Sequence, residues 1–329
     1  MKKRYIFLIG VPLLLAVALF FLSRPTANSE RKINWNATFD RDFAIKLGLD
    51  WQAAYLAILD DLKIKKVRLP ARWSDIEPEE GKFSYADLDW QVAEATKRNT
   101  NVVLAVGYRL PRWPECHDPS WVKDLRPAVL AYIEKTVNRY KDNPAVFAWQ
   151  VENEPFLPFG ECPPFDVNLL DEEIALVKKL DNRPVIVTDS GELSIWVRAA
   201  KRADIFGTTM YRWVWNQYLG SYEYPIPPVF FRIKERLTRL FVGQEKPFVV
   251  IELQAEPWTH KQIYEISIED QLKLMSLSEI KATVDYANQT GFSDYYLWGV
   301  EWWYYLKQNS QPEYWDYFKN LVEVNNIKQ

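Results

Sequence analysis

The chain has 329 residues, a formal net charge of −3, 48% hydrophobic residues and 26% charged residues. These proportions are typical of a soluble globular protein and argue against long disordered tails and basic nucleic-acid-binding domains, so we expect no nucleic-acid partner. Only two His and two Cys are present, which argues against His-built zinc sites and iron–sulfur clusters, and we expect neither a metal nor an organic cofactor. Aromatic residues make up 15% of the chain. We therefore expect carboxylate chemistry beside aromatic surfaces.

The first 30 residues differ from the rest. Basic residues at positions 2–4 precede an apolar run over residues 5–22, which would be roughly 27 Å long as a helix, about one hydrocarbon core. We expect a cytoplasmic basic stub, a signal-anchor transmembrane helix and a short linker that ends at residue 30. A cleaved signal peptide is the alternative. In either case residues 31–329 would lie outside the cytoplasm, tethered to the cell membrane by one span or secreted.

From residue 33 onward, short β-rich runs alternate with longer helical patterns. Strands are expected at residues 34–39, 66–69, 102–106, 146–151, 184–188, 205–210, 248–251 and 295–298. Helices are expected near residues 50–63, 86–99, 121–141, 168–181, 193–202, 227–241, 268–290 and 312–326.

Eight such repeats predict a (β/α)₈ TIM barrel in one domain, residues 31–329. Runs such as 102–106 are apolar throughout, as strands covered on both faces must be. A doubly wound open sheet is the competing architecture, but no strand is followed by a G-x-G-x-x-G phosphate loop. We expect a monomer.

Two glutamates follow apolar strands at positions that face each other across a closed barrel. Glu154 lies just after the strand at 146–151, and Pro155 prevents that strand from continuing. Glu252 directly ends the strand at 248–251. Paired carboxyls suit glycoside hydrolysis, in which one donates a proton and the other attacks the anomeric carbon; retaining enzymes hold the two about 5–5.5 Å apart.

These residues resemble a known family. Asn153-Glu154-Pro155 after strand four and Glu252 closing strand seven are similar to the clan-A retaining glycoside hydrolases, which include cellulase-type enzymes, β-galactosidases and mannanases. The stretch from Arg68 to Phe83 is similar to the R-x-x-x-x-W-x-x-x-E-P-x-x-G-x-F pattern of β-galactosidase-like members. Trp298-Gly299, at the end of strand eight, is also similar.

The resemblance implies roles for six residues. Glu154 would be the general acid/base, Glu252 the nucleophile and Arg68 the cation that keeps the nucleophile ionised. The other three would contact the substrate or the nucleophile: Asn153 would bind the sugar 2-hydroxyl, Tyr211 would contact the nucleophile, and Trp298 would form a platform beneath the sugar.

Some features depart from the family pattern. Cellulase-type members usually place histidines near strands three and six, yet His117 and His260 fall in loops, where we expect solvated side chains. Glu256 competes with Glu252 for the role of nucleophile, and we prefer Glu252 because it directly ends the apolar strand. Strand alternation places Glu152 toward the helices, as a structural acid.

Other residues near the strand ends allow two interpretations. Asp189 and Glu192 could reach the cleft, and a helix N-cap role for Ser190 or Asp189 is the alternative. Several Trp residues follow strands and would either pack in the core or stack on sugar rings: Trp113, Trp213, Trp215, Trp258, Trp302 and Trp303.

The two cysteines follow adjacent strands. Cys116 comes after strand three and Cys162 after strand four, and in an exported protein we expect them to form a disulfide that braces the loop carrying Glu154. Burial of two free thiols is the alternative.

The sequence therefore predicts a retaining glycoside hydrolase that cleaves β-linked O-glycosyl bonds of an extracytoplasmic carbohydrate. A non-catalytic carbohydrate-binding barrel and a surface scaffold domain are the alternatives, although neither requires acids at both strand ends.

Overall fold

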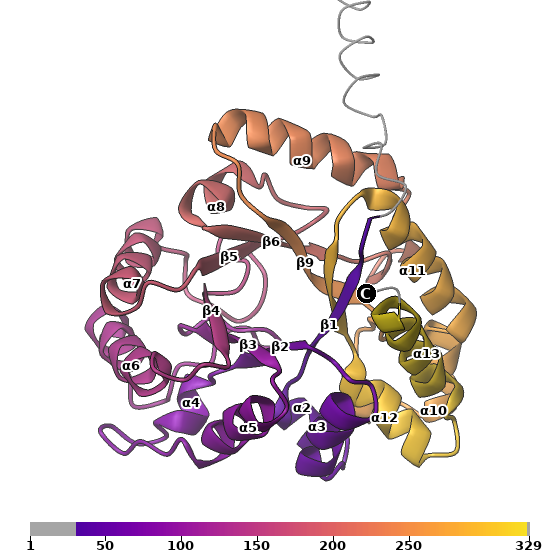
Figure 1. The fold of residues 1–329 in the computed structure, drawn as a ribbon, viewed down its shortest axis with the longest axis horizontal. Coiled ribbons are helices and arrows are strands. Elements are labelled where there is room, and N and C mark those ends of the chain that lie inside the picture. Colours follow the sequence, from indigo (N-terminus) through magenta and orange to yellow (C-terminus); the bar gives the residue numbers. More distant parts are fainter. Residues whose placement is uncertain (1–30, 328–329) are drawn as a thin grey trace, which may run out of the picture.

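Eight parallel strands close into a barrel in the computed structural model, which describes residues 31–327 (Figure 1). The strands follow one another around the barrel in chain order, and the last pairs with the first. They are β1 (Asn34–Thr38), β2 (Lys66–Pro70), β3 (Asn101–Val106), β4 (Val146–Val151), β5 (Val185–Asp189), β6 (Ile205–Met210), β9 (Phe248–Gln254) and β10 (Asp294–Trp298). The predicted TIM barrel is confirmed.

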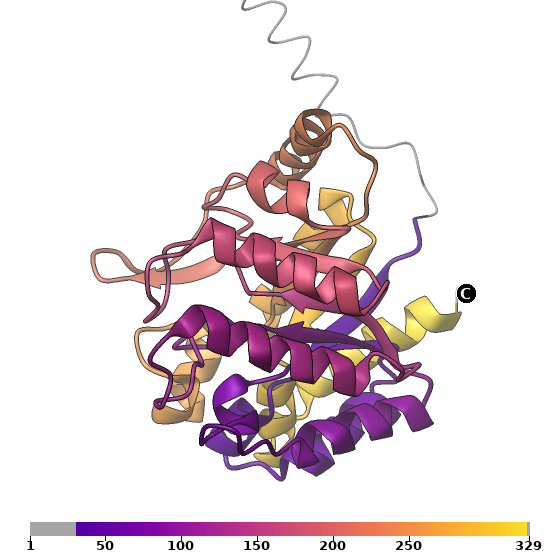
Figure 2. The same ribbon diagram turned by 90° about the vertical axis from the view of Figure 1, so that its left-hand side faces the viewer.

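Helices surround the strands on the outside (Figures 1 and 2). Those in the expected positions are α3 (Trp51–Asp60), α5 (Ala86–Lys97), α6 (Leu125–Tyr140), α7 (Val167–Leu180), α8 (Val197–Arg202), α9 (Pro228–Val242) and α13 (Glu313–Ile327). The single helix expected over 268–290 is wrong. It is divided into α10 (Ile268–Leu274) and α11 (Leu277–Thr290) because Ser276 starts the second helix with a capping box to Glu279.

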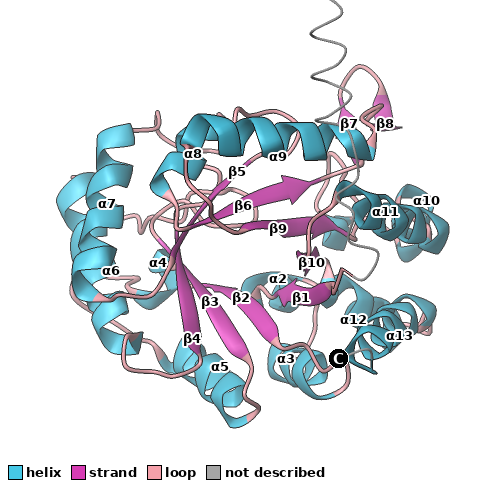
Figure 3. Cartoon of the chain, turned by 45° about the horizontal axis from the view of Figure 1, so that its top comes forward, coloured by secondary structure: helices cyan, strands magenta, loops and turns pink. Residues whose placement is uncertain are grey.

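Several short elements were not expected from the sequence. They are α2 (Arg41–Lys46), α4 (Trp73–Ile76), the 3₁₀ helix η1 (Ile263–Glu265), α12 (Val300–Gln308) and an antiparallel hairpin of β7 (Trp213–Asn216) and β8 (Gly220–Glu223). The hairpin follows β6 and stands apart from the barrel strands (Figure 3). It matters for function because it lies at the end of the barrel where the strands stop.

The apolar core has two layers. A large layer fills the space between the strands and the surrounding helices. A smaller cluster lies in the barrel interior and includes Val103, Ala148, Ile186, Ile251 and Tyr296. The interior is tight beside β6, since a Cβ added to Gly207 would lie 2.9 Å from Thr188 and 3.2 Å from Ile251. The apolar interior closes the barrel below the polar residues at the strand ends.

The predicted anchor helix lies outside the described residues, so it stays a prediction, as do the domain boundary at residue 30 and the location of the protein. Among residues 31–327, no helix combines the length and the apolar character that a membrane span requires.

Candidate active site

A cleft of about 600 Å³ opens at the carboxyl ends of the strands. Glu154, Glu252, Tyr211 and Trp298 all line it, so four of the residues predicted from the sequence come together in one place. Its aromatic lining also includes Trp113, Phe159, Trp215, Tyr222, Tyr224 and Trp258. Such a surface suits sugars, whose C–H faces pack against flat rings while their hydroxyls need polar partners.

A β-bulge directs Glu252 into the cleft. Thr208 pairs with Val250, but the next residue, Thr209, pairs with Glu252, so β9 carries one extra residue at this point. Ile251 packs in the barrel interior and Glu252 also faces inward, where strict alternation would turn one of them outward. The bulge therefore places a carboxylate at the upper end of the apolar interior.

Glu252 is held by one cation and one hydroxyl. Arg68 Nη2 donates to Glu252 Oε1 at 2.7 Å, and the Tyr211 hydroxyl donates to Glu252 Oε2 at 2.8 Å. Arg68 is fully buried inside the barrel, and it also donates to Thr38 and Gln150. Both oxygens of Glu252 thus have donors, and one of these donors is a buried cation.

Glu154 has different surroundings. Its backbone is in the left-handed region, with φ of 45°, and its N–H donates to Thr188 Oγ1 at 2.8 Å. The side chain accepts a hydrogen bond from Thr209 Oγ1 at 3.1 Å. Burial, followed by the negative charge of Glu252, raises the pKa of Glu154 well above its usual range. Glu154 is therefore the member of the pair that keeps its proton to higher pH.

Asn153 lies just behind the cleft wall. Its Oδ1 accepts from Gln150 and Thr188, and its Nδ2 donates to Glu115 Oε2 at 3.4 Å. Only 2% of the residue is exposed. Its expected contact with the sugar 2-hydroxyl stays a prediction.

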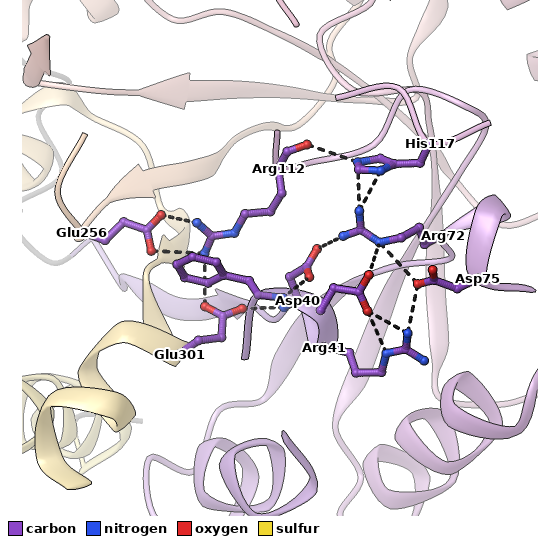
Figure 4. Close-up of polar contacts among 10 residues, drawn as sticks. Asp40, Arg41, Arg72, Asp75, Arg112, His117, Glu256 and Glu301 are labelled. Atoms are coloured by element: carbon purple, nitrogen blue, oxygen red, sulfur yellow. Dashed lines mark hydrogen bonds and ion pairs between the residues drawn. The ribbon is translucent and has the colours of Figure 1, made fainter. Parts of the chain in front are cut away.

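Trp298 is stacked on an arginine that the sequence did not single out. The Arg112 guanidinium lies 4.1 Å from the centre of the Trp298 ring and 3.6 Å from that of Phe43. Arg112 also pairs with Glu256 and Glu301, as Figure 4 shows. The Glu256 carboxylate is thus engaged by Arg112, the residue that stacks on Trp298. Glu252 also has polar partners, but it faces the cleft.

The expectation of a solvated His117 is wrong. The residue is 6% exposed, and Arg72 Nη1 lies 2.7 Å from its Nδ1 (Figure 4). Arg72 in turn pairs with Asp40. Burial, together with the neighbouring Arg72 charge, lowers the pKa of His117 to about 4. The neutral ring therefore accepts a hydrogen bond from the Arg72 guanidinium. His260 is exposed, as expected.

The loops after β3 and β4 are joined by a disulfide between Cys116 and Cys162, with an S–S distance of 2.08 Å. Nearby, the Glu152 carboxyl accepts from the backbone N–H groups of Tyr108 and Arg109, on the outer side of the strands where alternation places it. This carboxyl and the disulfide fix the loops that flank Glu154.

The remaining acids and tryptophans divide between the cleft and the core. Glu192 and Ser190 line the cleft, and Glu192 accepts the N–H of Tyr211 at 2.8 Å, whereas Asp189 is buried behind them. Of the two interpretations of the strand-end tryptophans, packing in the core holds for Trp302 and Trp303, which are fully buried, whereas Trp113, Trp215 and Trp258 line the cleft. Among the described residues, no group of His, Cys, Asp and Glu could hold a metal ion.

We expect a strong coupling between Arg68 and Glu252. Substituting Arg68→Met leaves a buried carboxyl without its cation and should lower the free energy of unfolding by about 3–5 kcal/mol. The double variant Arg68→Met/Glu252→Gln should lose less than the sum of the two single variants, which denaturant titration of all four proteins would measure. Additive losses would contradict a direct pair.

No protein-family model matches the chain. Short stretches are similar to two curated proteins of Aspergillus terreus: probable mannan endo-1,4-β-mannosidase A-1, with 39% identity over 61 residues, and A-2, with 37% over 68 residues. These stretches cover 18% and 20% of this chain and 16% of each relative.

Solved structures are similar over most of the barrel. A β-galactosidase from Bacillus circulans sp. alkalophilus has a TM-score of 0.56 at 13% identity, over 82% of this chain and 50% of its own. Xylanase 10B from Thermotoga petrophila has a TM-score of 0.54 at 16% identity, over 82% of this chain and 83% of its own. A GH5_18 protein from Bifidobacterium longum, crystallised with Manβ1-4GlcNAc, has a TM-score of 0.55 at 12% identity, over 81% of this chain and 68% of its own. This chain spans only about half the length of the β-galactosidase it resembles. The chain thus has the eight-stranded parallel barrel found in the clan-A glycoside hydrolases.

Proposed function

We propose that the protein is a retaining glycoside hydrolase that cleaves β-linked O-glycosyl bonds. The observation that carries the proposal is the pairing of two glutamates in one cleft with opposite surroundings: Glu252 beside a buried arginine, and Glu154 with a pKa raised by burial and by negative neighbours. A carboxyl paired with a cation, beside a second carboxyl whose pKa is raised, is the arrangement that acid-and-nucleophile catalysis requires.

The reaction would proceed in two displacements. In the first, Glu252 attacks the anomeric carbon while Glu154 donates its proton to the leaving oxygen, which gives a glycosyl ester on Glu252 and a free alcohol. In the second, Glu154 removes a proton from water, the water attacks the anomeric carbon, and the carboxylate of Glu252 leaves. Tyr211, which donates to Glu252, would steady the attacking carboxylate.

The barrel likeness and the short mannosidase-like stretches support this class of reaction but do not select a sugar. A barrel that binds carbohydrate without cleaving it would need the aromatic lining but not the arginine-paired acid. The Arg68–Glu252 pair therefore favours the enzyme over the binding module.

Substituting either glutamate tests the assignment. On a panel of aryl β-glycosides, Glu154→Gln and Glu252→Gln should each lose nearly all turnover, and azide should restore product formation in both. The azide product should be the β-glycosyl azide for the Glu154 variant and the α-glycosyl azide for the Glu252 variant, because only in the second does azide replace the nucleophile.

Glu256→Gln is the matched comparison, since Glu256 also lines the cleft but pairs with Arg112. It should show no azide rescue. Wild-type turnover in both the Glu154 and Glu252 variants, or α-glycosyl azide from the Glu256 variant, would contradict the assignment.

The raised pKa of Glu154 predicts an alkaline limit to activity. Because the first displacement needs the proton of Glu154, kcat/KM should fall as the pH rises through that pKa. With a 2,4-dinitrophenyl leaving group, which departs without a proton, the part of this fall that Glu154 causes should disappear. An alkaline limb of the same shape for both leaving groups would argue that Glu154 does not contribute to it.

We also propose that the catalytic domain acts outside the cytoplasm, as the apolar run at residues 5–22 suggests. The disulfide supports this location because disulfides persist in oxidising compartments. Protein purified without reductant and then denatured should show no thiol that reacts with a maleimide. Two reactive thiols would contradict the proposal.

A further inference from the structure

A third glutamate, Glu115, lines the same cleft as Glu154 and Glu252. It lies in the loop after β3, directly before Cys116, and is 8% exposed. No charged side chain among residues 31–327 forms an ion pair with it, and its side-chain partner is the amide of Asn153. Burying an ionised carboxyl without a charged partner costs free energy, so such a group usually has a functional or structural role.

The loop fixes the position of Glu115. Its backbone has φ of 73°, and Arg112 has φ of 84°, a region that residues other than glycine rarely adopt. The Leu110 N–H donates to the carbonyl of Glu115, the Glu115 N–H donates to the carbonyl of Arg112, and the adjacent cysteine is tied to the next loop. Backbone strain persists where the surroundings enforce it, and it clusters at functional sites.

Packing also confines the side chain from outside. A Cβ added to Gly160, in the loop after β4, would lie 2.6 Å from the Cβ of Glu115. Only glycine at position 160 leaves room for the glutamate, so the two loops fit together around it. The carboxyl is thus held against the cleft by both loops.

Burial and the charge of Glu252 favour the protonated form of Glu115. Burial, followed by the negative charge of Glu252, raises the pKa of Glu115 to about 8. The charges of Arg109 and Arg68 lower this pKa, but by less than burial and Glu252 raise it. Arg109 donates to backbone carbonyls of the loop after β4, and Arg68 is paired with Glu252. Since Asn153 donates to one oxygen of Glu115, the other oxygen is available to carry the proton and to donate it in a hydrogen bond.

We propose that Glu115 is a third functional carboxyl of the cleft, which binds a hydroxyl of the substrate as an uncharged hydrogen-bond donor beside the two catalytic glutamates. The proposal rests on the proposed function and extends it to the substrate. The residue recognises a neutral sugar that carries a free hydroxyl close to the anomeric carbon, and an acidic sugar group at this position would meet a cluster of carboxyls.

The proposal is tested by the direction in which Glu115→Gln shifts the alkaline limb of the kcat/KM profile, relative to the wild type. If turnover needs protons on both Glu115 and Glu154, loss of either proton stops the enzyme. In Glu115→Gln only Glu154 still titrates, so the limb should move to higher pH. If ionised Glu115 were harmless, its charge would raise the pKa of Glu154 in the wild type, and the same substitution would move the limb to lower pH. A limb that moves to lower pH, or does not move, overturns the proposal.

Two further variants separate binding from structure. Glu115→Ala, which removes the donor, should lower kcat/KM about 10- to 100-fold on the aryl β-glycoside that the wild type cleaves best, whereas Glu115→Gln keeps a donor and should lose less.

Glu173→Gln is the matched control. Glu173 is a buried glutamate on α7, its pKa is raised by burial and by Glu152, and it does not line the cleft. The alkaline limb of the kcat/KM profile of Glu173→Gln should coincide with that of the wild type. Equal losses for Glu115→Ala and Glu115→Gln would overturn the proposal.

A measurement without turnover keeps the two proposals apart. In protein labelled with ¹³C at the glutamate carboxyls, the resonance that disappears in Glu115→Gln should titrate near pH 8 rather than in the ordinary range of a glutamate. Titration in the ordinary range overturns the proposal for Glu115, whatever the enzyme cleaves. Absence of hydrolysis on every glycoside would instead contradict the proposed function.

Discussion

The buried pair of Arg68 and Glu252 is the interaction on which the rest of the site depends. A guanidinium with no exposed surface can remain in a barrel interior only if its charge is matched and its donors are used, and here Glu252, Thr38 and Gln150 meet both needs. The same pair fixes Glu252 as a negative charge at the base of the cleft. Burial, together with that charge, raises the pKa of Glu154 and of Glu115, so the ion pair contributes to the protonation of both neighbouring acids.

The backbone departs from regular strand geometry in two places, and both departures bring a catalytic carboxyl to the cleft. The bulge in β9 turns Glu252 inward directly after Ile251, and the left-handed backbone of Glu154 turns its carboxyl toward the same cleft. The disulfide and the carboxyl of Glu152 hold the two adjacent loops so that the strained residues keep their positions. A second ion-pair cluster, around Arg112, supports Trp298 and occupies Glu256. The site thus combines one carboxylate, protonated acids and an aromatic surface.

The sequence was sufficient for the barrel because its strands are short apolar runs that end at recognisable acids, and strand ends in this architecture share one face. It was not sufficient for the break before Leu277, since the helical pattern continues through the capping residue Ser276. Nor could it place His117 or Glu115. Their burial follows from backbone angles after Arg112 and from contacts with distant residues such as Arg72 and Gly160, which no local pattern encodes.

The most direct test of the account is to trap the intermediate. A 2-deoxy-2-fluoro β-glycoside with a good leaving group slows the second displacement, so the glycosyl ester should accumulate on the protein. Peptide mapping by mass spectrometry should find one added sugar on the peptide that carries Glu252, and the label should be absent from the Glu252→Gln variant. A label on Glu256 or Glu115, or a wild type that cleaves glycosides with inversion and never carries the label, would contradict the account.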